Sequence, residues 1–306
     1  MNQNVKFINE LRINNAKQPQ GVRKLWQALA PPGSDCCEEC PNWPDCQDAG
    51  IGCGDETVDC NDGSSGDPCG SSSTTQYGPL LDTYWGQGCV YNQLCPTEGL
   101  VQVWTSLGFA YEPECDGNLP CDHFYTGCVA TAMAQIINYF EHPNSYNYSS
   151  LQPKYYSWDF NKSGADEVAR LMRDAGESVN MSYGCDGSGA YTSGVNDALE
   201  DDFGYAYGGD YSSTISSVTI KQNLRNSKPV ILTGCDSRYG RCHAWVCDGY
   251  ETYTDQSCYS YLYYHMNWGW NSDSWNGWYG VSSSSWDAPN GHTYQYNNDV
   301  LYNINP

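Results

Sequence analysis

The sequence predicts an α+β fold, because one strong helical pattern is followed by several consecutive strand patterns. Apolar side chains recur at helical spacing over residues 128–140. Further along, residues 229–233, 243–250 and 261–270 are rich in aromatic and branched side chains, which favour strands. The order of the elements therefore favours α+β over the regular alternation of strand and helix that builds a parallel sheet.

The first predicted helix begins at Cys128 and ends before Pro143. Its apolar positions are Val129, Met133, Ile136, Ile137 and Phe140, and alanines fill several of the positions between them. A second helix is predicted from Ala165 to Ala175.

The composition excludes two kinds of partner. The chain has 14 Lys and Arg residues against 36 Asp and Glu residues, a net charge of -22. Nucleic acid and anionic membrane surfaces would be repelled by this charge, so neither is expected as a partner. No stretch approaches the ~18 consecutive apolar residues that a membrane span needs, so membrane insertion is not expected either.

Cysteine is unusually frequent, with 17 residues, which favours a compartment where disulfides form. We therefore expect a secreted, extracellular protein. The residues after Met1 lack a basic tip and an apolar run, so we expect the signal peptide to lie outside this chain. The alternative is a cytosolic chain whose cysteines bind metal.

The texture of the sequence changes near residue 77, which predicts two regions. Residues 1–76 form an N-terminal linker-like region with an acidic, cysteine-rich segment at 35–69, and apolar runs make 77–306 one large domain. Seven cysteines lie in the acidic segment: Cys36, Cys37, Cys40, Cys46, Cys53, Cys60 and Cys69. Cys37 and Cys40 are half of a zinc signature, but no second pair follows at zinc-ribbon spacing. We predict disulfides here, and neither a metal site nor a cofactor.

Cys128 is the candidate nucleophile. At a helix start, unpaired backbone N–H groups stabilise an anion and lower the pKa of a thiol. The same N–H groups could stabilise the oxyanion that forms when a thiolate attacks an acyl carbon. With 16 other cysteines present, the alternative is that Cys128 is one more half-cystine.

His243 is the candidate base, because it opens a predicted strand that would hold its ring on a rigid element. His265 is less easily dismissed, since it lies two residues before Asn267. The Asn267 side chain could orient an imidazole while Trp268 and Trp270 shield the bond from water. A surface or packing role is expected for the other three histidines, His123, His142 and His292.

Five blocks of sequence follow one another in a fixed order over residues 79–306. They are Pro79-Leu80-Leu81 with Trp85-Gly86-Gln87 and Tyr91-Asn92; Gly127-Cys128-Val129-Ala130-Thr131-Ala132-Met133-Ala134-Gln135-Ile136-Ile137 with Tyr139 and Pro143; Gly176 to Gly184 with Gly187-Ser188-Gly189-Ala190; His243-Ala244-Trp245-Val246 with Asp248-Gly249; and Asn267-Trp268-Gly269-Trp270 with Gly277-Trp278-Tyr279. Together these blocks closely resemble the streptopain-like cysteine peptidases of the papain-like clan.

The resemblance implies a papain-like fold, in which the helix that carries the nucleophile packs against an antiparallel sheet. It implies that Cys128 is the nucleophile, His243 the general base and acid, and Asn267 the residue that orients the imidazole. It also implies that the Gln87 amide completes the oxyanion hole. The residues expected to contact the substrate are Trp268, which would also cover the orienting bond, Trp245 and Gly189.

The sequence departs from the family pattern in three places. Arg241 and Cys242 stand where two glycines usually precede the histidine, so a cross-link is expected close to His243. Cys247 is expected on the same strand face as His243, where it would be either disulfide-bonded or a free thiol. A long segment separates Gln87 from Cys128, and four cysteines within it are expected to be disulfide staples: Cys89, Cys95, Cys115 and Cys121. Finally, residues 1–76 would stand in the position of an inhibitory propeptide.

The sequence thus predicts a secreted cysteine endopeptidase, made as a zymogen, that cleaves protein or peptide substrates through an acyl-enzyme. A propeptide or a protein inhibitor is a further expected partner. One alternative keeps the cysteine and histidine but acts on other amides or transfers acyl groups. Another is a disulfide-rich binding module with a dead active site. The peptidase hypothesis leaves Cys128 as the odd thiol among the 17 cysteines, with 16 available for up to eight disulfides.

Overall fold

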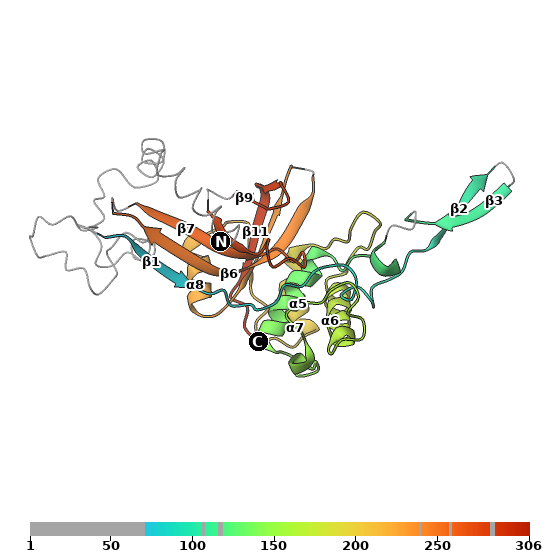
Figure 1. Ribbon diagram of the computed structural model, residues 1–306, viewed down its shortest axis with the longest axis horizontal. Coiled ribbons are helices and arrows are strands. Elements are labelled where there is room, and N and C mark those ends of the chain that lie inside the picture. Colours follow the sequence, from blue (N-terminus) through green and yellow to red (C-terminus); the bar gives the residue numbers. More distant parts are fainter. Residues whose placement is uncertain (1–70, 106–107, 116–118, 239, 257–258, 282–284) are drawn as a thin grey trace, which may run out of the picture.

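Figure 1 shows the computed structural model of the chain, which describes residues 71–105, 108–115, 119–238, 240–256, 259–281 and 285–306. The strands of the main sheet are β1 (Ser73–Tyr77), β4 (Asp210–Ser212), β5 (Val230–Cys235), β6 (Cys242–Thr254), β7 (Ser260–Asn267), β8 (Gly277–Gly280) and β11 (Tyr296–Tyr302). Their order is β4-β11-β5-β6-β7-β8, with β1 paired to the second half of β6, and every pairing is antiparallel. The three predicted strands form β5, β6 and β7 at the centre of this sheet.

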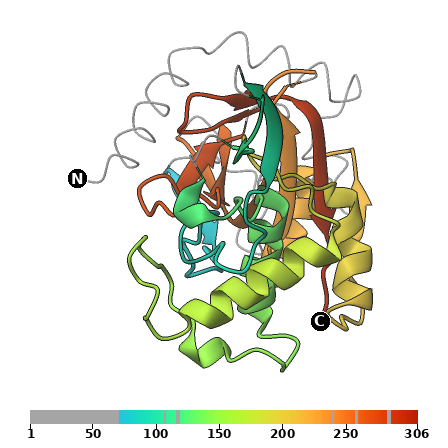
Figure 2. The ribbon, with the colours of Figure 1, turned by 90° about the vertical axis from the view of Figure 1, so that its right-hand side faces the viewer.

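Four α-helices accompany the sheet in the described part of the chain: α5 (Cys128–Phe140), α6 (Ala165–Ser178), α7 (Val195–Asp201) and α8 (Ser217–Arg225). Short 3-10 turns occupy Pro120–Asp122, Tyr148–Ser150 and Thr192–Gly194. Figure 2 shows the yellow-green helix α6 lying outside α5, with the orange and red strands on the other side. The nine residues from Val129 to Ile137 are all buried, because α5 is packed between the sheet and α6. The predicted helix and its end before Pro143 are confirmed.

Strand β6 separates two apolar clusters, because successive side chains point to opposite faces of a strand. Ala244 and Val246 belong to the cluster that contains α5 and α6. Trp245 and Cys247 belong to a second cluster on the other face, which is rich in aromatic rings. One strand therefore contacts the nucleophile helix on one face and an aromatic layer on the other.

The segment between Gln87 and Cys128 carries a hairpin of its own, formed by β2 (Leu100–Thr105) and β3 (Gly108–Pro113). Figure 1 shows this hairpin extending away from the rest of the molecule. Two further short strands, β9 (Trp286–Asp287) and β10 (Thr293–Tyr294), pair with each other near the end of the chain.

The sheet begins inside the N-terminal region predicted from composition. β1 starts at Ser73 and pairs with β6 through Tyr77, so it spans the expected boundary between residues 76 and 77. The expectations for the acidic segment 35–69 lie outside the described residues. In the described residues, none of the helices is long and apolar enough to cross a membrane.

Candidate active site

Cys128 is the first residue of α5, as predicted, and the chain reaches it through a glycine that nothing can replace without strain. Gly127 has φ 86°, a left-handed conformation, and a Cβ atom there would lie 2.6 Å from Met181 Sδ and 3.1 Å from the Ser188 carbonyl oxygen. Two hydrogen bonds stabilise the first turn of α5. Thr131 donates its backbone N–H and its hydroxyl to the Gly127 carbonyl oxygen, at 3.1 and 2.9 Å. The helix start is therefore fixed before any substrate is present.

The Cys128 thiol lies at the point where α5 meets the start of β6. Burial raises the pKa of this thiol above its ordinary value, and hydrogen bonds from the backbone N–H groups of Ala244, Val129 and Cys128 lower it. The helix start acts in the predicted direction, but burial dominates, so the thiol rather than the thiolate is favoured in the unliganded protein. The contact with Ala244 brings the sulfur beside the residue that follows His243.

The His243 ring is held by a main-chain carbonyl. Its Nε2 lies 2.8 Å from the carbonyl oxygen of Trp268. Since a carbonyl only accepts, Nε2 carries the proton and donates it, which leaves Nδ1 as the unprotonated nitrogen of the neutral ring. Burial lowers the pKa of His243 from its ordinary value to about 4, and the bond to Trp268 opposes this shift. At neutral pH the ring is thus an uncharged base.

Aromatic rings surround His243 and keep it dry. Trp270 is the nearest, with 4.7 Å between ring centroids, and Tyr294, Trp245 and Trp268 follow at 5.8, 6.0 and 6.4 Å. Trp268 and Trp245 are fully buried, so neither side chain is exposed to a substrate, contrary to the expectation for both. Their role in this structure is to pack beneath the site.

Gly189 lies at an open position beside the nucleophile helix. It is exposed, and no atom lies within 4 Å of where a Cβ would stand. It pairs with Ser182, and the preceding Ser188 carbonyl lines the approach to Gly127. Of the three residues expected to contact the substrate, Gly189 alone is exposed beside the start of α5.

Asn267 does not contact the imidazole. Its Nδ2 donates to the Thr83 carbonyl oxygen at 2.6 Å and to Gln135 Oε1 at 2.9 Å, on the α5 side of the sheet. Asn267 pairs with Val246, and directly opposite residues share a face, whereas His243 lies on the other face. Its Oδ1 instead accepts the N–H of Gly269 at 3.3 Å, so Asn267 braces the turn that carries the Trp268 carbonyl.

Gln87 is half-buried and reaches the site through its backbone. Its carbonyl oxygen accepts the N–H of Thr126 at 3.0 Å, two residues before Cys128. The segment before it is anchored by Trp85, which is fully buried and donates its indole N–H to the Gln152 carbonyl oxygen at 2.8 Å. The structure thus brings the Gln87 backbone next to the start of α5.

The sequence model of the Peptidase C10 family matches residues 85–279 of this chain, which span the glutamine, cysteine, histidine and asparagine segments described above. The chain belongs to the peptidase C10 family. Streptopain of Streptococcus pyogenes serotype M1 is 32% identical over an alignment of 233 residues that covers 64% of this chain and 53% of streptopain. The chain therefore spans about half the length of the curated relatives it matches first.

Two further comparisons place this C10 chain among known proteins. The thiol protease/hemagglutinin PrtT of Porphyromonas gingivalis is 31% identical over 180 residues, covering 49% of this chain and 20% of PrtT. The structure of active wild-type interpain A cysteine protease of Prevotella intermedia superposes with a TM-score of 0.53 at 24% identity, covering 74% of this chain and 94% of interpain A. The predicted papain-like α+β fold and the predicted family are confirmed.

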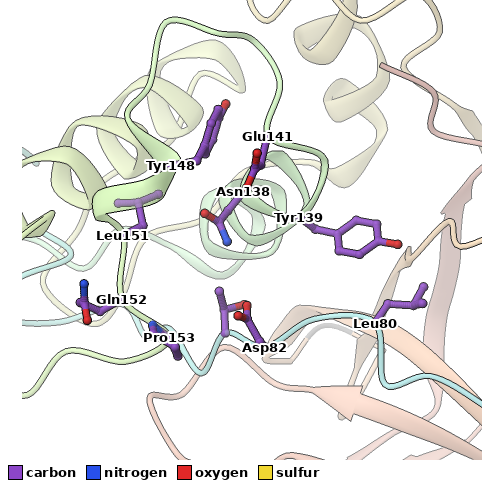
Figure 3. A pocket seen from close by; sticks show the side chains of 10 residues that line it. Leu80, Asp82, Asn138, Tyr139, Glu141, Tyr148, Leu151, Gln152 and Pro153 are labelled. Atoms are coloured by element: carbon purple, nitrogen blue, oxygen red, sulfur yellow. The ribbon is translucent and has the colours of Figure 1, made fainter.

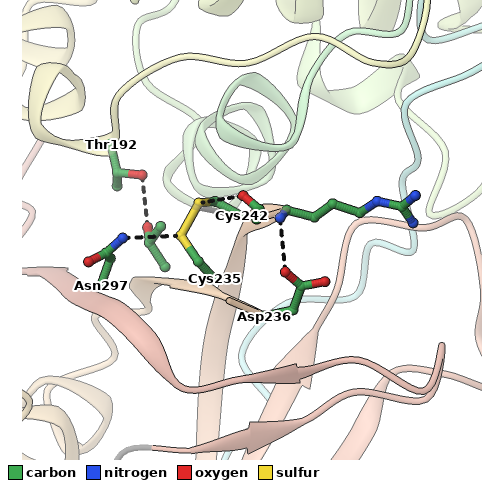
Figure 4. Close-up of a disulfide and its surroundings, with 8 residues drawn as sticks. Thr192, Cys235, Asp236, Cys242 and Asn297 are labelled. Atoms are coloured by element: carbon green, nitrogen blue, oxygen red, sulfur yellow. Dashed lines mark hydrogen bonds between the residues drawn. A yellow bond between two sulfur atoms is a disulfide. The ribbon is translucent and has the colours of Figure 1, made fainter. Parts of the chain in front are cut away.

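Disulfides strengthen this C10 domain at three places in its described part. They join Cys89 to Cys121, Cys115 to Cys185, and Cys235 to Cys242. The last bond, shown in Figure 4, links the end of β5 to the start of β6 immediately before His243, where a cross-link was predicted. In the described part of the chain, Cys95 and Cys247 are free and buried, so Cys128 is not the single unpaired thiol and Cys95 is not a staple.

A cavity lies away from this site, at the other end of α5. It has a volume of about 280 Å³ and is lined by residues that include Asn138, Tyr139 and Glu141 (Figure 3). These residues belong to the last turn of α5 and its C-cap, roughly 18 Å along the helix axis from Cys128. The cavity contains none of the predicted catalytic residues.

Two parts of the His243 environment were not predicted from the sequence. Tyr294 packs its ring against His243 with 5.8 Å between the ring centroids, and burial raises the pKa of the Tyr294 hydroxyl. No pattern in the sequence links this late residue to the site. The other is the Trp268 carbonyl, which has no signature because every residue carries one.

Proposed function

We propose that this C10 chain is a secreted cysteine endopeptidase in which Cys128 attacks a peptide carbonyl and His243 moves the proton. One observation carries the proposal most directly. The Cys128 sulfur, at the start of α5, accepts the N–H of Ala244, while the neighbouring His243 has its Nε2–H committed to Trp268 and its Nδ1 free to accept a proton. These contacts support the pairing of a nucleophile with an oriented base, because the sulfur contacts the backbone of the residue that follows His243.

The proton moves as the bond forms, because burial favours the neutral thiol and the neutral imidazole in the resting site. His243 Nδ1 takes the proton from sulfur while sulfur bonds to the substrate carbonyl carbon. The resulting imidazolium then protonates the departing amine, which leaves a thioester on Cys128. Water, deprotonated by the same Nδ1, hydrolyses the thioester and restores the thiol.

The oxyanion of each tetrahedral intermediate needs donors that are already in place. We assign the first donor to the backbone N–H of Cys128 and the second to the side-chain amide of Gln87. Asn267 is a positioning residue in this proposal, because it holds the turn whose Trp268 carbonyl orients the imidazole. Gly189 offers exposed backbone to the substrate chain on the other side of Cys128.

The substrates are proteins or peptides, and the N-terminal region is the proposed inhibitory propeptide of a zymogen, with the catalytic domain at residues 77–306. Secretion is supported by the three disulfides, which persist in oxidising compartments. No cofactor or metal takes part in the proposed reaction.

The free cysteines provide a matched test. Cys128→Ala is expected to abolish casein cleavage and labelling by an epoxide inhibitor of cysteine peptidases. Cys247→Ala removes a second free thiol that is fully buried on the other face of β6, so it should keep both activities. Mass spectrometry of the labelled wild type should find the inhibitor on Cys128 and on neither Cys95 nor Cys247.

Casein cleavage that survives in purified Cys128→Ala would overturn the proposal. So would a wild type that cleaves neither casein nor a peptide library after removal of its N-terminal region. In that second case, release of products from non-protein amides would identify an amidase or acyltransferase that uses the same pair of residues.

A further inference from the structure

The two proposed oxyanion donors belong to segments that lie 41 positions apart in the sequence. Between Gln87 and Cys128 the chain leaves the domain, forms the β2–β3 hairpin and returns. A donor amide is useful only when it is held within a few tenths of an ångström of the oxyanion. The long excursion therefore makes it necessary to fix Gln87 independently of the hairpin.

A disulfide closes the excursion at its base. Cys89 and Cys121 are separated by 32 residues, yet their Cα atoms lie 5.4 Å apart. The bond joins the outgoing chain two residues after Gln87 to the returning chain seven residues before Cys128. Closing a loop of this length removes much of the conformational freedom that would otherwise loosen its ends.

Asn92 closes the same base with hydrogen bonds. Its side chain is fully buried, and Nδ2 lies 2.8 Å from the carbonyl oxygen of Pro120, 3.1 Å from that of His123 and 3.3 Å from that of Phe124. Three carbonyls of the returning chain thus converge on one amide of the outgoing chain. The Asn92 backbone N–H donates to the Gly88 carbonyl oxygen at 3.0 Å, which ties the amide back to the residue after Gln87.

The closed base leads directly to the two donors. Beyond Phe124, the Thr126 N–H donates to the Gln87 carbonyl oxygen at 3.0 Å, and Gly127 and Cys128 follow. The Asn92 bonds and the disulfide thus lie between this contact and the hairpin. Removing this buried amide is costly, because the His123 and Phe124 carbonyls would lose a donor away from water, whereas the Pro120 carbonyl keeps the His123 N–H.

We propose that Asn92 and the Cys89–Cys121 disulfide form a stem clamp, which positions the Gln87 amide against the Cys128 N–H so that the oxyanion hole withstands the inserted hairpin. The inference rests on the proposed peptidase function. Asn92 is a positioning residue in it, because it acts through Gln87 and touches no reacting atom.

The first test compares reactions that need the oxyanion hole with one that does not. Asn92→Ala should lower kcat for a peptide substrate by about 10-fold with KM unchanged, and weaken a peptide aldehyde inhibitor by a similar factor. Alkylation of Cys128 by iodoacetamide builds no oxyanion, so its rate should stay at the wild-type value.

Asn223→Ala is the matched control, since Asn223 is also buried and accepts the Asn303 N–H at 2.7 Å, away from the site. It should change the thermal midpoint without changing kcat.

A double-mutant cycle separates action through Gln87 from general loosening of the fold. Gln87→Ala should lower kcat by about 100-fold. Adding Asn92→Ala to it should lower kcat little further, because the donor that Asn92 positions is already gone. Effects that multiply in the double variant, or a fall in the iodoacetamide rate that matches the fall in kcat, would overturn the stem clamp.

The disulfide gives a second route that stands even where Asn92→Ala does not fold. Cys89→Ser with Cys121→Ser should reproduce the kcat loss, the aldehyde weakening and the unchanged alkylation. Cys115→Ser with Cys185→Ser, which removes the bond further out along the hairpin segment, should keep kcat. Equal kcat in the two double variants would refute the clamp while leaving the peptidase function intact, whereas a wild type without cleavage would refute the function itself.

Discussion

The two faces of β6 prepare the two reacting groups in opposite ways. On the helix face, Ala244 and Val246 are small enough for α5 to pack closely, and the Ala244 N–H reaches the Cys128 sulfur. On the other face, His243 and Trp245 lie in a layer of large aromatic rings that excludes water. The first face provides a close approach, and the second provides a dry environment.

This difference explains how one short stretch of strand can serve both halves of a nucleophile and base pair. Because side chains alternate, His243 is placed on the aromatic face without interfering with the packing of α5. The backbone of the next residue remains free to donate to sulfur. The aromatic face keeps the pKa of His243 near 4, whereas hydrogen bonds from backbone N–H groups counter the effect of burial on the thiol.

Enlarging the helix face where Ala244 contacts Cys128 should have the largest effect on activity. Ala244→Leu should push α5 away from β6 and lower kcat/KM by about 100-fold, because displacing a nucleophile by about 1 Å is enough for such a loss. It should also lower the free energy of unfolding by about 1–3 kcal/mol through overpacking. Peptide hydrolysis and urea unfolding measure the two effects.

Val246→Phe is the control for this prediction, since it overpacks the same face two residues further from Cys128. It should cost similar stability and much less activity. Equal losses of kcat/KM in the two variants would mean that the Ala244 contact has no special role.

Asn267 lies on the helix face and tests whether the two faces cooperate. Asn267→Ala leaves the Thr83 carbonyl and Gln135 short of a donor, so the free energy of unfolding should fall by about 1–3 kcal/mol. Loosening of the turn should let the Trp268 carbonyl drift from His243 and lower kcat by about 10-fold. Unfolding curves and single-turnover rates measure both. A loss of kcat of about 10⁴-fold at unchanged stability would instead indicate direct contact between Asn267 and the imidazole.

The parts of this site that depend on periodicity were predictable from the sequence. Apolar spacing gave the helix that begins at Cys128, and the run of aromatic and branched residues gave the strand that carries His243. Fold class followed from the order of these elements. Such patterns are local, so they survive whatever the rest of the chain does.

The parts that depend on long-range contacts were not predictable. Side-chain alternation in β7 places Asn267 opposite Val246, and only the register of the β6–β7 pairing reveals this. The same holds for the partner of Cys235 and for the free state of Cys95, because connectivity cannot be read from cysteine spacing. The orienting group for His243 proved to be a backbone carbonyl, which leaves no mark in the residue types.

The aromatic face can be weakened at Trp270, with a smaller effect that depends on pH. His243 must be unprotonated at Nδ1 to act as a base, so with a pKa of about 4 the acid limb of kcat/KM should lie near pH 4 in the wild type. Trp270→Ala admits water to the ring, which should raise the pKa of His243 toward its ordinary value and move the acid limb upward by about 2 units. At pH 5 the variant should be about 10-fold slower than wild type, and at pH 7.5 the two should nearly match.

Trp158→Ala is the control, because it removes an exposed indole that stacks on Tyr156 instead, and its acid limb should not move. A Trp270→Ala profile that falls in parallel with wild type at every pH would show that the indole positions substrate rather than keeping the base dry.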